Sequence, residues 1–86
     1  ARKSFDSDMT KLVINVSSRQ NVRPKDILGA IAGETGVAGK LVGDIDVQAN
    51  LTFVDVSTTK VKQVIDGMRR ANIRGNRLKI EVYKGR

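Results

Sequence analysis

The chain has 86 residues, of which 40% are hydrophobic, and its formal net charge is +7 at pH 7. This length suits a single domain with one hydrophobic core, and the apolar content is that of a folded chain rather than a disordered tail. Cysteine and histidine are both absent, so disulfide bonds and thiolate metal sites are excluded, and the commonest general base and metal ligand are missing.

The N-terminal part predicts an arm followed by a strand. Residues 1–9 are polar and charged, and we expect them to form a flexible linker or arm, with the domain occupying residues 10–86. Apolar and polar side chains alternate from Thr10 to Ser18, which is typical of a half-buried strand.

A helix and a second strand are expected next. Pro24 suits the first position of a helix, where no backbone N–H is needed, and the glycines at 33 and 36 are expected to stop that helix. A further helical turn is expected within Val37–Gly43, and the alternation over residues 44–48 indicates a short strand.

The second half repeats this order. A tight turn at Ala49–Asn50 leads to a third strand over residues 51–56, and Ser57 or Thr58 is expected to cap the following helix. That helix has a one-sided apolar stripe. Residues 72–76 turn the chain back into a final strand over residues 78–83. The stripe consists of Val61, Val64, Ile65 and Met68.

The resulting order β-α-β-β-α-β predicts an α+β, ferredoxin-like sandwich of the RRM (RNA recognition motif) type. In this fold a four-stranded antiparallel sheet carries two helices on one face, and the other face stays open. On the open face we expect Val13, Asn15, Leu51, Phe53, Asp55, Lys79, Glu81 and Tyr83.

Positive charge is concentrated in the last third of the chain. Residues 1–59 hold seven basic and seven acidic side chains, whereas residues 60–86 hold nine basic and two acidic ones. A one-sided excess of this kind indicates binding to a polyanion, although a solvated surface and capping of the second helix would explain part of it. The candidate phosphate contacts are Arg69, Arg70, Arg74, Arg77 and Lys79, with Arg19, Arg23 and Lys25 in the first loop as a second group.

Three other candidate motifs lack residues that their function requires. The stretch Gly33–Lys40 is not a phosphate-binding P-loop, because Glu34 replaces the first glycine and Leu41 replaces the magnesium ligand. Its GxxG patterns lack the basic residues of a KH-type clamp. Asp44 and Asp46 share one face of a strand but have no third ligand. We therefore expect no catalysis, no metal and no cofactor.

Base stacking is expected to contribute little. In an RRM, two or three bases stack on aromatic side chains of the central strands. Here Phe53 occupies a stacking position and Tyr83 joins the same face, but Val13 and Leu51 stand where further aromatics are expected. Most of the affinity must therefore come from the basic residues.

Several blocks of the sequence resemble one known family, the DbpA-like RNA-binding domain found at the C-terminus of some bacterial DEAD-box RNA helicases of the DbpA, DeaD/CsdA and YxiN types. The resemblance spans roughly residues 10–84. The blocks that carry it are Val22–Ile31 (VRPKDILGAI), Gly36-Val37, Val42–Val47 (VGDIDV), Leu51–Val56 (LTFVDV) and Ile73–Ile80 (IRGNRLKI).

The resemblance implies that the module tethers a helicase to structured RNA, most directly ribosomal RNA, which the ATPase core of the same polypeptide then unwinds. It also implies roles in ribosome assembly and cold adaptation. It assigns RNA contact to Arg23, Arg74 and Arg77. It implies a structural role, fixing the first helix on the sheet, for Asp26, Ile27, Gly29, Ala30 and Ile31. No signal peptide or membrane-spanning segment is apparent, so we expect a cytoplasmic protein.

Two other functions remain open from the sequence. One is a stand-alone, ribosome-associated RNA-binding domain without an ATPase partner. The other is a protein-interaction module with a degenerate RRM fold, which the weak aromatic platform favours.

Overall fold

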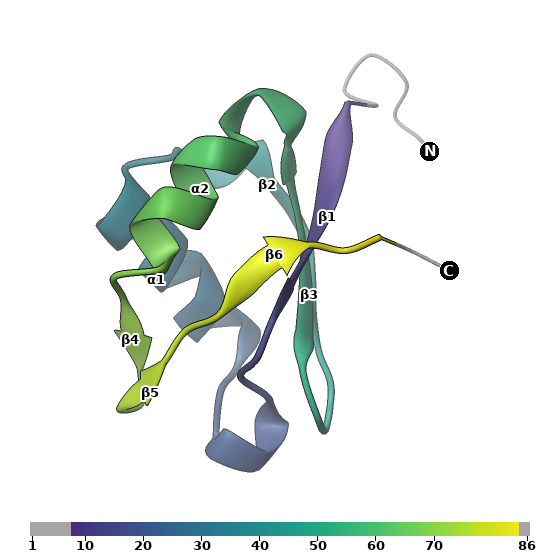
Figure 1. Ribbon diagram of the computed structural model, residues 1–86. Coiled ribbons are helices and arrows are strands. Elements are labelled where there is room, and N and C mark those ends of the chain that lie inside the picture. Colours follow the sequence, from purple (N-terminus) through teal and green to yellow (C-terminus); the bar gives the residue numbers. More distant parts are fainter. Residues whose placement is uncertain (1–7, 85–86) are drawn as a thin grey trace.

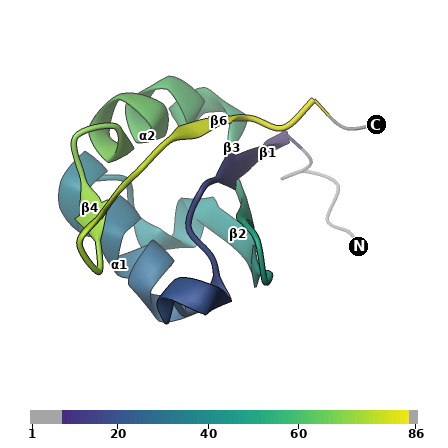
Figure 2. The same cartoon turned by 60° about the horizontal axis from the view of Figure 1, so that its bottom comes forward.

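The computed structural model describes residues 8–84, which form one four-stranded antiparallel sheet, two helices and a separate two-strand hairpin (Figure 1). The sheet has the order β2-β3-β1-β6, which confirms the ferredoxin-like, RRM-type α+β fold. Both helices lie on the same face of the sheet (Figures 1 and 2). The elements are β1 (Met9–Ile14), α1 (Pro24–Thr35), β2 (Val42–Val47), β3 (Thr52–Ser57), α2 (Val61–Met68), β4 (Asn72–Ile73), β5 (Asn76–Arg77) and β6 (Ile80–Val82).

The alternation of the two central strands creates the core. Leu12 and Ile14 of β1 are fully buried, and the intervening Val13 is only half-buried because it points to the open face. The helices contribute side chains spaced four residues apart, which places them on one helical face. The fully buried helical side chains are Ile27, Ile31, Val64 and Met68, and those of β3 are Thr52, Val54 and Val56.

A close approach of α1 and α2 depends on a glycine. A Cβ atom added at Gly67 would lie 2.6 Å from Cγ2 of Thr35 and 3.0 Å from the carbonyl oxygen of Glu34. Gln63, one turn earlier on α2, donates a hydrogen bond from its side-chain amide to the carbonyl oxygen of Thr35 at 2.7 Å. The end of α1 therefore rests directly on the middle of α2.

The expected end of the first strand was wrong. The first strand ends at Ile14 rather than Ser18, because Ser17 turns inward and its backbone N–H donates to Oε1 of Gln20, at the end of the 3-10 helix η1 (Ser18–Gln20). Of the two glycines expected to stop the first helix, Gly33 lies inside α1, whereas Gly36 caps its end with a left-handed φ of 76°.

The expected cap of the second helix is also absent. A 3-10 helix, η3 (Thr58–Lys60), precedes α2, and the Ser57 hydroxyl bonds to the Thr59 hydroxyl instead of a backbone N–H. The expected turn before β2 is present as the 3-10 helix η2 (Gly39–Leu41). The arm expected over residues 1–9 lies mostly outside the described residues, and Met9 is the first residue of β1. Residues 85–86 of the expected domain also lie outside the described part.

The sequence predicted only a turn over residues 72–76, whereas the structure has a hairpin there. Arg74 (φ 55°) and Gly75 (φ 79°) are the two residues that join β4 to β5, and positive φ at both is the signature of a type I′ turn. The hairpin lies beside α1, apart from the four-stranded sheet (Figure 2). Over residues 8–84, neither helix combines the length and apolar character that a membrane crossing requires.

Candidate nucleic-acid interface

Hydrogen bonds join the loop between β1 and α1 to the β4–β5 hairpin. The side-chain amide of Gln20 donates to Oδ1 of Asn76 at 3.1 Å. Asn15, just after β1, donates to the carbonyl oxygen of Arg77 at 3.1 Å and accepts from the backbone N–H of Lys79 at 2.7 Å. Two segments that are about 60 residues apart therefore form one surface at the end of the sheet where β1 ends.

This surface carries most of the predicted phosphate contacts, and all of them are exposed. Arg69, Arg77 and Lys79 line a shared groove of about 450 Å³ beside β6. Arg74 at the tip of the hairpin faces the start of α1, where Arg23 and Lys25 lie. We call this surface the basic edge; its members are Arg19, Arg23, Lys25, Arg69, Arg74, Arg77 and Lys79.

Two carboxylates lie at the basic edge: Glu81, which lines the groove with Arg69 and Lys79, and Asp26 at the start of α1. Oδ2 of Asp26 accepts a hydrogen bond from the backbone N–H of Arg23 at 3.0 Å, which satisfies a free donor at the start of α1. The same oxygen lies 3.5 Å from Nη2 of Arg74. The structural role implied for Asp26 is thus present, and it comes with an ion pair to the hairpin.

Arg70 lies apart from the other candidates. It lines a groove between the two helices with Glu34, Lys62 and Asp66, where the charges are mixed. The structure therefore separates Arg70 from its neighbour Arg69, because consecutive residues at the end of a helix point about 100° apart.

Phe53 and Tyr83 lie together on the open face of the sheet, away from the helices. Their rings make an edge-to-face contact with centroids 4.8 Å apart, and Tyr83 is 41% exposed. The ammonium of Lys11 lies over the Phe53 ring, 5.7 Å from its centroid, and pairs with Asp55 at 3.4 Å. Phe53, which is half-buried, thus already has an intramolecular cation beside its ring.

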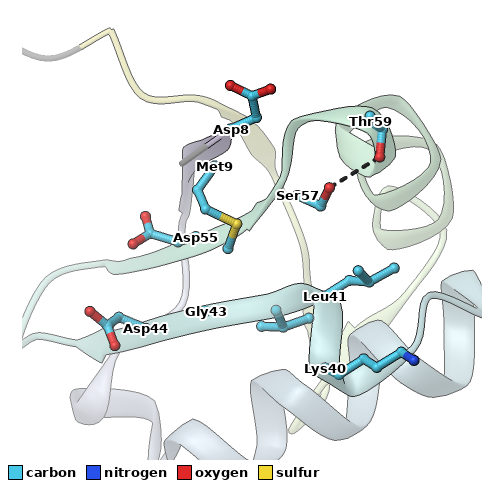
Figure 3. A pocket seen from close by; sticks show the side chains of 10 residues that line it. Asp8, Met9, Lys40, Leu41, Gly43, Asp44, Asp55, Ser57 and Thr59 are labelled. Carbon is cyan, nitrogen blue, oxygen red and sulfur yellow. Dashed lines mark hydrogen bonds between the residues drawn. The ribbon is translucent and has the colours of Figure 1, made fainter. Parts of the chain in front are cut away.

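A cavity of about 550 Å³ lies at the other end of the sheet, between the starts of β1 and β2 and the end of β3 (Figure 3). Its carboxylates are Asp8, Asp44 and Asp55, against a single cation from Lys40. Such a lining repels phosphate. Within residues 8–84, no group of three or more acidic side chains is arranged to hold a metal ion.

Sequence reasoning missed two kinds of residue in these surfaces. The first is Lys11, whose alternation with Val13 places it on the open face, and which was not included there. The second is the role of three amides, Asn15, Gln20 and Asn76, which hold the loops of the basic edge together. The bonds Asn15–Arg77 and Gln20–Asn76 join residues 62 and 56 positions apart, so no local pattern indicated them.

Comparisons with known proteins agree with this geometry. The family model of the DbpA RNA binding domain matches residues 11–82. The chain is 27% identical over 78 residues to the ATP-dependent RNA helicase DbpA of Bacillus subtilis (strain 168), covering 91% of this chain and 16% of that protein.

Among solved structures, the chain resembles the Nab3 RRM from a study of cis element recognition of non-polyadenylated RNAs. The TM-score is 0.71 at 18% identity, over 90% of this chain and 97% of that one. At this identity the likeness supports the RRM fold alone. The match of the family model over nearly the whole described chain shows that this protein belongs to the DbpA RNA-binding domain family and is an RNA-binding domain.

Proposed function

We propose that this domain tethers a DEAD-box helicase core to structured RNA, ribosomal RNA in the first place, and that it does so through the basic edge. The relative from Bacillus subtilis is named an ATP-dependent RNA helicase, and this chain corresponds to only 16% of it, so an ATPase core in the same polypeptide would account for the remainder. The tether would work in the cytoplasm, in ribosome assembly and in the cold response.

The observation that carries this proposal is the joining of two basic loops into one fixed surface. Seven exposed cations lie along it, against the two carboxylates of Asp26 and Glu81. Arginine forks bind phosphates bidentately, and loops fixed by hydrogen bonds lose little conformational entropy on binding. A fixed array of cations favours an RNA whose phosphates are themselves fixed, such as a hairpin.

The aromatic pair on the open face supports a second, weaker contact to an unpaired base. We expect Phe53→Leu, which keeps most of the apolar volume, to weaken binding of a single-stranded RNA by about 5- to 10-fold, because stacking of one base contributes about 1–3 kcal/mol. Binding of a blunt duplex should change less than twofold. Fluorescence anisotropy with both RNAs would measure this, and equal affinities of variant and parent for the single strand would remove Phe53 from the interface.

The proposal is tested by anisotropy titration of three labelled RNAs: a ribosomal hairpin with a single-stranded flank, a plain duplex and a plain single strand. Each is titrated at about 50 and 200 mM salt, since phosphate contacts weaken binding steeply over this range. Preferential, salt-sensitive binding of the hairpin supports a site-directed tether. Equal, weak binding of all three supports a general RNA anchor.

A protein-interaction function is the second candidate, and the open face favours it. Lys11 and Asp55 already pair beside Phe53, and Asp46 and Glu81 add negative charge on the neighbouring strands. This face is less suited to RNA than the basic edge. Failure of all three RNAs to bind at either salt concentration would favour this candidate over the RNA tether.

A further inference from the structure

The carboxylate of Asp26 contacts the guanidinium of Arg74, a group that an RNA phosphate could also bind. Its Oδ2 lies 3.5 Å from Nη2 of Arg74 and 3.0 Å from the backbone nitrogen of Arg23. Phosphate and carboxylate bind a guanidinium through the same N–H donors. Of the two carboxylates at the basic edge, Asp26 and Glu81, Asp26 is the one that pairs with an arginine of the edge.

The backbone at Arg74 is not one that arginine favours. Its φ of 55° is left-handed, and asparagine or glycine is preferred at the first central position of a type I′ turn. The Asn76 side chain stabilises the turn by donating to the carbonyl oxygens of Ile73 at 3.2 Å and Arg74 at 3.3 Å. The backbone of the turn therefore does not require an arginine, whose side chain instead contacts Asp26.

The pair is open to exchange with an incoming anion. The side chains are 49% exposed for Arg74 and 23% exposed for Asp26, and ion pairs at such exposure are weak and reversible. A phosphate that binds Arg74 either replaces the carboxylate or lies close to it, where the two negative charges repel each other.

Resting on the RNA-binding function of the basic edge, we propose that Asp26 is an intramolecular competitor of RNA phosphate for Arg74. This carboxylate lowers the affinity of the basic edge for RNA. Arg74 then binds a phosphate only when neighbouring cations already hold other phosphates of the same RNA. The domain then discriminates against isolated phosphates and short single strands, and the ion pair opens only within a multivalent complex.

The decisive variant is Asp26→Asn, because an amide oxygen still accepts the hydrogen bond from Arg23 while the charge is lost. We expect it to bind the flanked hairpin about 3- to 10-fold more tightly at about 50 mM salt, since relief of one like-charge contact is expected to change affinity by this amount. The increase in affinity should be larger for a short single strand, so the ratio of the affinities for hairpin and single strand should decrease. Thermal melting confirms that the variant is folded.

Glu34→Gln is the matched control, because Glu34 is an exposed carboxylate at the other end of the same helix. Loss of the Glu34 charge should change the affinity for the flanked hairpin less than twofold. The second control is Asp26→Asn combined with Arg74→Asn. Compared with Arg74→Asn alone, the double variant should bind RNA less than twofold more tightly, because position 74 no longer carries a guanidinium for Asp26 to pair with.

The outcomes separate this inference from the function on which it rests. If Arg74→Asn weakens RNA binding but Asp26→Asn leaves it unchanged or weakens it, the competitor role is wrong and the basic edge stands. An equal gain in both backgrounds, or an equal gain from Glu34→Gln, would show a general charge effect and also overturns the competitor role. If Arg74→Asn has no effect at all, the basic edge itself is wrong.

Discussion

The double substitution Arg74→Asn, Arg77→Gln is expected to weaken binding of a flanked hairpin RNA by about 10- to 100-fold at low salt, roughly tenfold for each lost phosphate contact. Asparagine is chosen at 74 because it adopts the left-handed conformation of the turn, so the hairpin keeps its shape. Glutamine at 77 keeps a long polar side chain on β5, and the backbone oxygen that accepts from Asn15 is unaffected.

The salt dependence distinguishes lost phosphate contacts from a distorted fold. The slope of log K against log salt should become shallower by about 0.7–0.9 for each contact removed. A control pair, Lys40→Gln with Lys62→Gln, removes the same charge at the other end of the sheet, near Thr59. If the control pair weakens binding as much as the first pair, net charge rather than the basic edge determines affinity.

The fold was largely predictable because its signals are local. Alternation in β1 and β3, Pro24 at the start of α1 and the stripe on α2 each lie within a few residues, and each corresponds to an element of the structure. The expected end of β1 was wrong, because the inward turn of Ser17 and its hydrogen bond to Gln20 interrupt the alternating pattern.

The candidate site was predictable in composition but not in arrangement. A surplus of arginine and lysine is visible in the sequence, and it indicated the right loops. Helix geometry explains why Arg69 and Arg70 face different grooves, but only once the end of α2 is known. The pairing of Arg74 with Asp26, 48 residues earlier, depends on the β4–β5 hairpin, which the sequence indicated only as a turn.

The glycines of the two helices are expected to respond to alanine with opposite signs. In an open helical position, Gly→Ala stabilises a protein by about 0.5–1 kcal/mol, because the unfolded chain loses conformational freedom. Gly29, in the middle of α1, is such a position, since a Cβ there meets nothing within 4 Å. Gly29→Ala should therefore raise the melting temperature by a few degrees in thermal unfolding followed by circular dichroism.

Gly67→Ala should lower the melting temperature instead. The added methyl group would lie 3.0 Å from the carbonyl oxygen of Glu34, which is backbone and cannot rotate away, so α1 and α2 must separate. Overpacking of this kind costs about 1–3 kcal/mol and outweighs the gain in helix propensity. A net loss of about 1–2 kcal/mol corresponds to about 4–16 °C in a domain of this size. If both alanine variants were stabilised equally, the close contact of α2 with the end of α1 would be absent in solution.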